Sequence, residues 1–426
     1  MDLLIRNGLV IDPYNNQKKI TDILINDGKI VDIGTGIGNN VQAARVIDAS
    51  GKLVAPGLID MHVHLREPGQ EEKETIVTGT RAAAAGGFTT IACMPNTCPV
   101  IDNKSLVEFI LLKSKQEGIV RVLPIGAISK GLKGEELAEI GQMVKAGAVA
   151  ISDDGRSIGS TALMRRALEY IRPFNIPIIA HCEDTTLSTG GCMHEGYYST
   201  ILGLPGISSA SETVMVARDI ILAEAAGARL HIAHVSTRKS VELVRQAKER
   251  GVIVTCEVTP HHFTLTDEAV CGFDTNTKMN PPLRSKDDVE AIRQGLSDGT
   301  IDVIATDHAP HTRTEKEQEY GRAPFGIIGL ETSLGLVLTE LVGNGVITIF
   351  DALSKMTINP ARILGLETSG IIPDAMADIT IIDPEVEWVV DVNTFASKAR
   401  NCPFHGLKLK GRAIMTIVNG RIVWEM

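Results

Sequence analysis

The amino-acid sequence predicts an α/β protein, with a (β/α)8 barrel in the middle of the chain and a small β-sandwich domain formed by both chain ends. First, eight short apolar runs, each followed by a stretch of helix-forming residues, lie between positions 55 and 365. Eight strand-then-helix units in about 300 residues match a TIM-type barrel better than an open sheet. Second, residues 1–54 and 366–426 are both rich in short β signals. We therefore expect a barrel over 55–365 and one small domain that combines 1–54 with 366–426.

The predicted barrel strands are apolar runs of three or four residues. They are Leu58–Asp60, Thr89–Ala92, Val120–Leu123, Val149–Ile151, Ile178–Ala180, Leu230–Ala233, Val252–Thr255 and Asp302–Ala305. The stretches between them, such as Glu74–Ala85 and Ser240–Arg250, have a helix-like composition. This alternation is typical of βα units that build a parallel sheet.

The chain ends read differently, as hairpins. Asp22–Ile25 and Lys29–Ile33 flank Asn26-Asp27-Gly28, a strong hairpin signal. Near the other end, Ala377–Asp383 and Met415–Val423 read as strands, and the second contains an Asn-Gly turn. Two β-rich ends around one barrel suggest that the termini meet in a single domain.

Composition excludes several functional classes. Apolar residues make up 44% of the 426 positions and the net charge is −10, which argues against a general nucleic-acid binder. The longest uncharged run, residues 82–101, is interrupted by two prolines, an asparagine and three threonines and does not read as a membrane-spanning helix, so we expect no membrane contact. The seven scattered cysteines lack close CxxC spacing, and no secretion signal is visible at the start. These features predict a cytoplasmic protein with free thiols.

Residues with metal-ligand chemistry follow five of the predicted strands. They are His62 and His64 after the first strand, Asp153 and Asp154 after the fourth, His181 after the fifth, His234 after the sixth, and Asp307 and His311 after the eighth. The carboxyl ends of barrel strands meet on one face, where barrel enzymes place their active sites. Imidazole and carboxylate side chains gathered there suit zinc or a similar divalent ion.

Each of these residues also has a structural explanation. A lone histidine at a strand end is more often hydrogen-bonded than metal-bound, and we expect this for His231, His261, His262 and His308. One of Asp153 and Asp154 can cap the following helix. Cys182 is expected to be a packed small side chain, although it lies close enough to the site to be a conditional ligand. The charged runs Glu71–Glu74 and Glu315–Glu317 are expected to be solvated.

Several longer motifs resemble one family. They are Asp60-Met61-His62-Val63-His64-Leu65-Arg66, Met94-Pro95-Asn96-Thr97, Asn280-Pro281-Pro282-Leu283-Arg284, Asp307-His308-Ala309-Pro310-His311 and Pro324-Phe325-Gly326-Ile327-Ile328-Gly329-Leu330-Glu331-Thr332. The HxH element alone is shared by many hydrolases. The combination resembles the class I dihydroorotases of the amidohydrolase superfamily, and the likeness covers nearly the whole chain.

The resemblance implies two zinc ions in each subunit. His62, His64 and Asp307 would hold the first ion, and His181 and His234 the second. Asp154 would bridge the two ions together with a hydroxide. Many relatives use a carboxylated lysine as the bridge, but the matching stretch here, Ala150–Asp154, has no lysine.

The resemblance also implies the reaction. It is the reversible cyclisation of N-carbamoyl-L-aspartate to L-dihydroorotate, the third step of de novo pyrimidine biosynthesis. Asp307 would take a proton from the hydroxide and pass it to the leaving ring nitrogen. The substrate-binding residues would be His64, Arg66, Asn96, Asn280, His311, Phe325 and Gly326. Among these, Arg66 offers a bidentate fork to the substrate carboxylate.

Partners and alternatives complete the expectations. The family resemblance implies a homodimer and a possible association with aspartate transcarbamoylase. The polar, glycine-containing segment 312–324 predicts a mobile loop over the site. One alternative is a related cyclic amidase: an allantoinase, a hydantoinase or a dihydropyrimidinase. The other is a catalytically dead scaffold. The presence of ligand-type residues at all six positions argues against it. The sequence assigns no role to residues 188–196.

Overall fold

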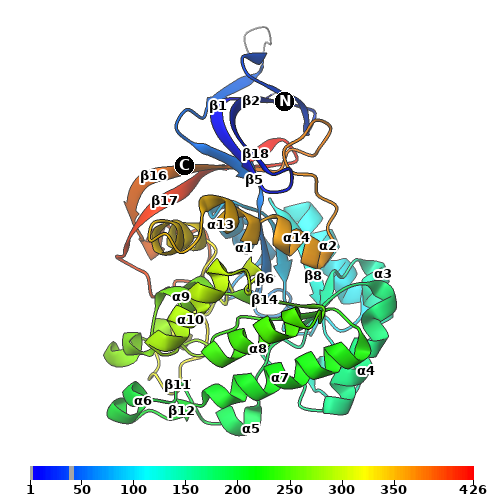
Figure 1. Cartoon of the computed structure of the whole chain (residues 1–426), viewed down its shortest axis with the longest axis vertical. Helices are drawn as coiled ribbons and strands as arrows, with labels where there is room; N and C mark the ends of the chain where they lie inside the picture. Colours follow the sequence, from blue (N-terminus) through cyan, green and yellow to red (C-terminus); the bar gives the residue numbers. More distant parts are fainter. Residues whose placement is uncertain (1–2, 38–42) are drawn as a thin grey trace.

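The computed structural model describes residues 3–37 and 43–426. The parts of the predicted segment 1–54 at positions 1–2 and 38–42 lie outside the described residues. A barrel occupies the larger part of the molecule, and a smaller β domain lies at one end of it (Figure 1). Both chain ends lie in this smaller domain, in agreement with the predicted fold class.

The barrel contains all eight predicted strands. They are β6 (Leu58–Val63), β7 (Phe88–Cys93), β8 (Arg121–Gly126), β9 (Ala150–Ile151), β10 (Ile178–Ala180), β13 (Leu230–Ile232), β14 (Val254–Val258) and β15 (Val303–Ile304). Neighbours in this list pair in parallel, in chain order. The last strand meets the first just beyond β15, where the His64 N–H donates to the His308 carbonyl at 2.9 Å. This contact nearly closes the barrel.

Helices follow the strands and cover the barrel (Figure 1). They are α1 (Ile76–Ala85), α2 (Lys104–Glu117), α3 (Ile140–Ala146), α4 (Thr161–Ile171), α5 (Thr185–Ser188), α6 (Tyr197–Leu202), α7 (Ser209–Ala226), α8 (Arg238–Glu249), α9 (Pro260–Thr264), α10 (Lys286–Ser297), α11 (Arg313–Lys316), α12 (Ser333–Leu336), α13 (Ile349–Lys355) and α14 (Ile358–Leu364). Side-chain caps begin many of them; Thr237 and Ser285, for example, each accept a first-turn N–H. Short helical turns are η2 (Lys130–Leu132), η3 (Arg172–Phe174), η4 (Asp267–Gly272), η5 (Thr275–Thr277), η6 (Val337–Val342) and η7 (Val392–Thr394).

The small domain is built on one hydrogen-bonded sheet drawn from both ends of the chain. Its strands are β1 (Leu3–Asp12), β2 (Gln17–Asn26), β3 (Lys29–Gly34), β4 (Arg45–Asp48), β5 (Leu53–Pro56), β16 (Ile379–Val389), β17 (Lys408–Val418) and β18 (Arg421–Glu425). Their order is β18-β17-β16-β5-β1-β2-β3, and β4 pairs with β1. The predicted turn residues Asp27 and Gly28 have φ of 48° and 82°, as the tightest hairpins require. The domain boundaries themselves stay a prediction, since β5 crosses the expected one.

Two threonines fix the small sheet to the barrel. Thr380 on β16 donates to the Gly87 carbonyl at 2.6 Å, and Thr416 on β17 donates to the Ala84 carbonyl at 2.7 Å. Both carbonyls lie at the end of α1, where helices leave acceptors unpaired. The sheet therefore supplies hydrogen bonds that the barrel helix lacks.

The two charged runs expected to be solvated are exposed or half-buried at most positions, but the expectation was wrong for one residue in each, Glu74 and Lys316. Glu74 is fully buried, and its carboxylate contacts His308 and Ser397. Lys316 is 6% exposed, and its ammonium donates to the carbonyls of Pro324 and Gly326. Charged side chains can be buried when they have hydrogen-bonding partners. The partners of Glu74 and Lys316 are not visible in the local sequence, so their burial could not be predicted from it.

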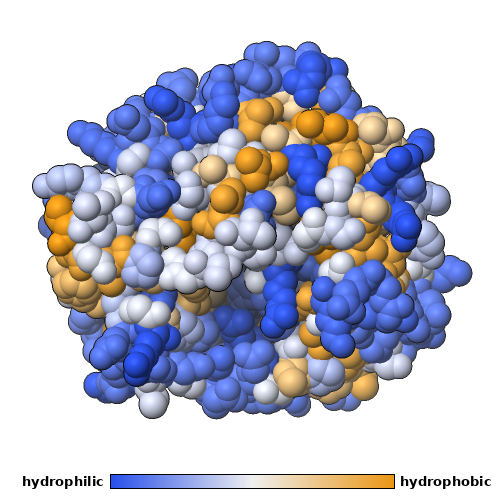
Figure 2. Space-filling model, turned by 90° about the horizontal axis from the view of Figure 1, so that it is seen from below, coloured by the Kyte–Doolittle hydropathy of each residue, from blue (hydrophilic) through white to orange (hydrophobic). Residues whose placement is uncertain are grey.

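The stretch 188–196 forms a small paired element. Its strand β11 (Met193–His194) runs parallel to β12 (Gly206–Ile207) beside α6. The surface at the end of the molecule away from the small sheet has a hollow in which hydrophilic residues are visible (Figure 2). Among the described helices, none combines the length and apolarity needed to cross a membrane.

Candidate active site

The six predicted metal ligands lie together at the carboxyl ends of the barrel strands. His62 is in β6 and His64 directly follows it, while the others lie one to three residues past their strands: Asp154, His181, His234 and Asp307. Every one of the six is at most 5% exposed. The alternation of β6 carries the His62 and His64 side chains to the same face, as their spacing predicted.

The first group of ligands surrounds Asp307. Its Oδ1 lies 2.9 Å from His64 Nε2 and 3.4 Å from His62 Nε2. These three atoms are close enough to one another to hold a single ion.

The second group surrounds Asp154. Its Oδ1 lies 3.5 Å from His234 Nε2 and 3.8 Å from His181 Nδ1, and the two imidazole nitrogens are 2.9 Å apart. Its Oδ2 lies 3.4 Å from His64 Nε2, in the first group. Asp154 is thus the one carboxylate that faces both groups of histidines.

The chemistry of this donor set fits divalent metal ions. Among the described residues, His62 Nε2 and Asp154 Oδ1 are buried and have no hydrogen-bond partner. Buried polar atoms are rarely left without a partner in folded proteins. Four imidazoles and two carboxylates match the ligand preference of zinc in catalytic sites. His62 and Asp154 both belong to a group whose possible ligand atoms lie within 4.8 Å of one another.

Several residues that sequence reasoning did not assign hold the ligands in place. Glu257 at the end of β14 lies with Oε1 2.5 Å from His62 Nδ1 and Oε2 3.2 Å from His231 Nε2. Glu183 Oε2 lies 2.9 Å from His181 Nε2. Such carboxylate–histidine pairs orient metal-binding rings and fix their tautomer. The strand predicted at 252–255 stopped short of Glu257, which is why this residue was missed.

Asp60 ties the two ends of the barrel together next to the ligands. Its buried carboxylate accepts the His62 N–H at 3.1 Å and the Thr306 N–H at 3.2 Å. One acid therefore connects β6 to the segment that carries Asp307. Burial raises the pKa of Asp60 to about 7.

Charge governs the protonation of the ligands. Burial acts to lower the pKa of His62, but the carboxylates of Asp307 and Asp154 outweigh it and raise that pKa well above its ordinary value. Burial acts to raise the pKa of Asp307, and the positive field of His62 and His64 reverses the shift, so that this carboxyl stays ionised. The same histidine charges are what a cation at this place would replace.

The backbone is unusual at three site residues. Arg66, His234 and Asp307 have φ of 61°, 30° and 46°, in the left-handed region that side-chain-bearing residues rarely adopt. Such conformations persist only where the surroundings hold them, and they concentrate at functional sites.

All seven predicted substrate-binding residues line one cavity of about 230 Å³, which is also lined by every predicted ligand except the fully buried His62. They are His64, Arg66, Asn96, Asn280, His311, Phe325 and Gly326. Met279 and Ala309 complete the apolar part of its lining. Among the residues that the structure describes, no lysine lines this cavity.

The polar side chains of the cavity already have protein partners. Arg66 Nε donates to the Pro310 carbonyl at 3.1 Å. Asn96 Oδ1 lies 2.8 Å from His64 Nδ1, and Asn280 Nδ2 donates to Glu183 at 2.9 Å. His311 Nε2 lies 2.8 Å from the Phe325 carbonyl, so this ring donates to a substrate only by exchanging that bond. These contacts fix the orientation of each side chain.

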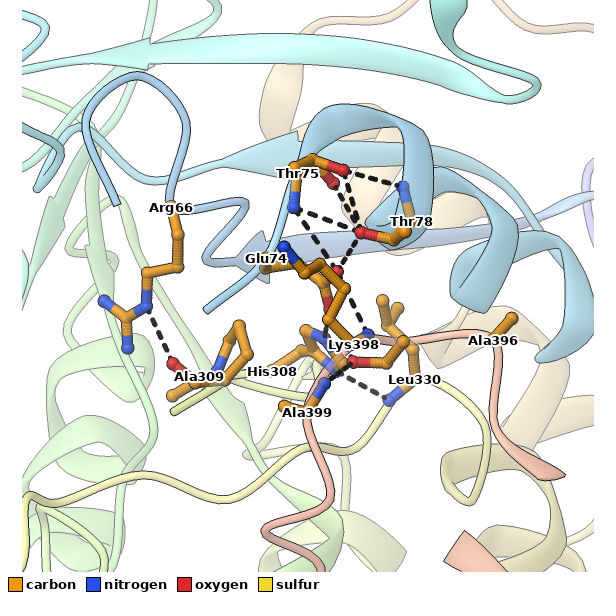
Figure 3. Close-up of polar contacts among 12 residues, drawn as sticks. Arg66, Glu74, Thr75, Thr78, His308, Ala309, Leu330, Ala396, Lys398 and Ala399 are labelled. Atoms are coloured by element: carbon orange, nitrogen blue, oxygen red, sulfur yellow. Dashed lines mark hydrogen bonds and ion pairs between the residues drawn. The ribbon is translucent and has the colours of Figure 1, made fainter. Parts of the chain in front are cut away.

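The residues expected to be structural lie outside this cavity. His308 Nε2 lies 3.3 Å from Glu74, beside Arg66 (Figure 3). His262 contacts Thr259 and the Pro281 carbonyl, and the His261 ring lies against it. Asp153 accepts the N–H groups of Ile128 and Ser129, and Cys182 Sγ faces Asp219 at 3.7 Å. Cys182 therefore packs against Asp219 and not into the cavity, as expected for a packed small side chain.

Comparison with known proteins agrees with this geometry. Residues 51–240 match a family model described as dihydro-orotase-like. A dihydroorotase of Pelotomaculum thermopropionicum is 61% identical over all of this chain and 99% of its own length. The chain belongs to the dihydroorotase family. A dihydroorotase of Acetivibrio thermocellus is 56% identical over 99% of this chain and 98% of its own length.

Solved structures place the dihydroorotase family chain in the wider amidohydrolase fold. An L-hydantoinase from Arthrobacter aurescens superimposes with a TM-score of 0.89, 28% identity, and coverage of 100% of this chain and 96% of that one. A dihydropyrimidinase from Brevibacillus agri superimposes with a TM-score of 0.86 at 23% identity, over 100% of this chain and 95% of its own. The second likeness shows the shared barrel fold alone.

Proposed function

We propose that this member of the dihydroorotase family interconverts N-carbamoyl-L-aspartate and L-dihydroorotate in pyrimidine biosynthesis, with two zinc ions held by the six buried ligands. The observation that carries the proposal is the convergence of three imidazoles and two carboxylates on one cavity that Arg66 also lines, with the imidazole of His62 directly behind them. When bound, two divalent ions supply a nucleophile from water near neutral pH and polarise the ring amide carbonyl.

In this proposal Asp154 would hold both ions. This role is supported by the contacts of Oδ1 with the His181–His234 pair and of Oδ2 with His64. A carboxylated lysine cannot take this place, because no lysine among the described residues lines the cavity.

Asp307 moves the proton. Its carboxylate lies beside His64 and also lines the cavity, so it reaches both the attacking water and the substrate. In hydrolysis it takes a proton from that water and gives it to the ring nitrogen as the amide C–N bond breaks. In cyclisation the same carboxyl group takes the proton from the nitrogen that attacks and gives it to the oxygen that leaves as water, as microscopic reversibility requires.

Arg66 binds the substrate carboxylate. The Pro310 carbonyl fixes its Nε, and the guanidinium lines the cavity. A planar guanidinium pairs with a carboxylate through two parallel hydrogen bonds. Asn96 and Asn280 border the same space, where they meet the rest of the ring, and the Phe325–Gly326 backbone forms its far side.

An assay in both directions tests the function. We expect dihydroorotate hydrolysis and carbamoyl-aspartate cyclisation, both lost with a chelator and restored by zinc. A panel with hydantoin, dihydrouracil and allantoin tests the cyclic-amidase alternative. Faster turnover of any of these than of dihydroorotate would contradict the proposal, and no turnover with full metal content would favour the scaffold alternative.

The partners of the chain come from the family resemblance. We expect a homodimer in the cytoplasm and an association with aspartate transcarbamoylase. Sedimentation of the purified chain, alone and with the transcarbamoylase of the same organism, measures both. A monomer that does not co-sediment would remove these two expectations and leave the catalytic proposal intact.

A further inference from the structure

The cavity has one side whose shape depends on a residue outside it. We call this side the substrate wall, meaning Ala309, His311, Phe325 and Gly326, all of which line the cavity. It consists of two segments, one following β15 and the other following α11, and the N–H of Ala309 joins them by donating to the Ile327 carbonyl at 2.9 Å. That bond alone does not fix how His311 and Gly326 face the substrate.

Asn401 contacts both segments from behind. Its Nδ2 donates to the carbonyls of Ala309 and Gly326, each at 3.0 Å, and its Oδ1 accepts the His311 N–H at 3.1 Å. Its own carbonyl accepts the Ile328 N–H at 3.0 Å. The side chain is 2% exposed and does not line the cavity.

The chain segment that carries Asn401 is itself held firmly. Glu331 accepts the N–H groups of Ala396 and Ser397, each at 3.1 Å, and the Ser397 hydroxyl donates to Glu74. Figure 3 shows this segment passing Glu74 and His308. This segment connects β16 to β17 of the small sheet. Through Asn401, the small domain therefore contacts the substrate wall.

We infer that Asn401 is a positioning residue that sets the substrate wall. The inference rests on the proposed function, because the wall acts on the substrate of that reaction. An amide is the one side chain of this size that donates two bonds and accepts another at once. With those three bonds lost, the contact of His311 with the Phe325 carbonyl and the bond from Ala309 to Ile327 would remain, but nothing would hold the two segments from behind. A misplacement of about 1 Å can reduce catalytic efficiency by about 100-fold.

The test compares Asn401→Ala with the wild type in dihydroorotate hydrolysis. We expect kcat/KM to fall about 10- to 100-fold, mainly through a higher KM, with zinc content unchanged. Asn401→Asp is isosteric and keeps the acceptor for His311, but it places a carboxylate against two carbonyl oxygens. It should be at least as impaired as Asn401→Ala.

Asn359→Ala is the matched control. Its Nδ2 donates to the Asp302 carbonyl at 2.8 Å, at the opposite end of β15. This variant loses a comparable amide–carbonyl bond and should keep the wild-type KM. An equal rise of KM in both variants would overturn the inference, as would a wild-type KM in Asn401→Ala.

Two further measurements separate positioning from general destabilisation. In a double-mutant cycle with His311→Ala, the Asn401→Ala effect should shrink, because both act through the same ring; full additivity would overturn the inference. Amide hydrogen exchange over 309–328 should accelerate in both Asn401 variants and not in Asn359→Ala. This readout does not depend on turnover. If the wild-type enzyme did not hydrolyse dihydroorotate, the proposed function would fail, but hydrogen exchange would still test the role of Asn401.

Discussion

At the residue scale, the site depends on buried carboxylates with different tasks. Asp307 contacts His64 and lines the cavity, whereas Glu257 contacts His62 and His231 and does not line the cavity. The first can exchange protons with the substrate. The second can only orient a ring, so the two acids should fail in different ways when changed.

Asp307→Asn should abolish turnover in both directions. The amide keeps the shape and an oxygen ligand but cannot carry a proton, and general acid–base groups contribute about 10²- to 10⁴-fold to rate. Rates of hydrolysis and cyclisation, measured with the zinc content of the same sample, test this. Activity within a few-fold of the wild type in a zinc-loaded variant would exclude Asp307 as the proton carrier.

Glu257→Gln should weaken metal binding. Loss of such an orienting carboxylate commonly costs about 10- to 100-fold in metal affinity. Competition with a chromophoric chelator measures the dissociation constant directly. Asp12→Asn, which changes a fully buried acid of the small sheet, is the control. Equal zinc affinity in Glu257→Gln and the wild type would show that His62 needs no such support.

The contrast between these two acids shows what the sequence could predict at this scale. Asp307 lies in a motif directly after a strand, and its neighbours are ligand-type residues. Glu257 is one acid at the end of an apolar run, with no local sign that His62, 195 positions away, lies beside it. A ligand-type residue directly after a strand can be recognised from the local sequence. The partner of a residue such as Glu257 is set by the fold and cannot.

At the element scale, the segment between α11 and the substrate wall is held by buried lysines. Lys316 donates to the Pro324 and Gly326 carbonyls, and Lys278 donates to the Tyr320 and Gly321 carbonyls. Lys278 also lies 4.7 Å from the centre of the Phe325 ring. The predicted mobility of 312–324 stays a prediction, and these contacts are what an opening motion would have to break.

Lys316→Met should loosen this segment. It removes two hydrogen bonds and keeps most of the side-chain volume. The Arg322 side chain is 78% exposed, so trypsin cleavage after Arg322 reports the change. We expect faster cleavage in the variant, with Lys239→Met on the exposed face of α8 as the control. An unchanged cleavage rate would mean that Lys278 alone holds the segment.

The same variant should change the dependence of stability on pH. Burial, and then the charge of Lys278, lower the pKa of Lys316 to about 7. The unfolded lysine keeps its proton up to its ordinary pKa of 10.5, so above pH 7 the unfolded state binds more protons than the folded one. The wild type therefore gains stability from this group as pH rises from about 7, by up to about 1.4 kcal/mol per pH unit. Lys316→Met lacks that gain, which denaturant unfolding at pH 7 and 9 measures; parallel pH profiles would contradict it.

The strands themselves were readable because each is a short apolar run with a helix after it. All eight barrel strands lie where the runs predicted, within a few residues at each end. Strand ends were less certain: β14 continues to Val258, three residues past its predicted end. Glu257 is buried there beside His62 and His231, which a search for apolar runs does not detect.

At the scale of the whole molecule, metal binding should contribute to stability. The ligands come from five strand ends, and removing the ions leaves buried donors and acceptors facing one another. Ligands that bind only the folded state stabilise it by about 2.7 kcal/mol at 100 times their dissociation constant. We expect the melting temperature to fall on chelation and to recover with zinc. In His62→Asn the response should shrink strongly, and an identical response there would place the stabilising ion elsewhere.

The two-domain plan was readable from β signals at both ends, but the reach of the small domain was not. The segment from Ser397 to Asn401 carries no motif with chemical meaning of its own. Its importance comes from contacts with Glu74, Gly326 and His311, each distant in the chain. One sequence without related sequences beside it holds no local signal for such contacts.

The position of Asn401 in the chain has a consequence for how the protein is made. A ribosome releases the metal ligands, ending with Asp307, well before Asn401, which lies 92 positions after its partner Ala309. β16, the neighbour of β5, also follows Asp307 in the chain, although it precedes Asn401. The nascent barrel can therefore capture its ions while the side that faces the substrate is still unfinished. In the order of synthesis, the support of the substrate wall therefore comes later than the residues proposed to bind the ions.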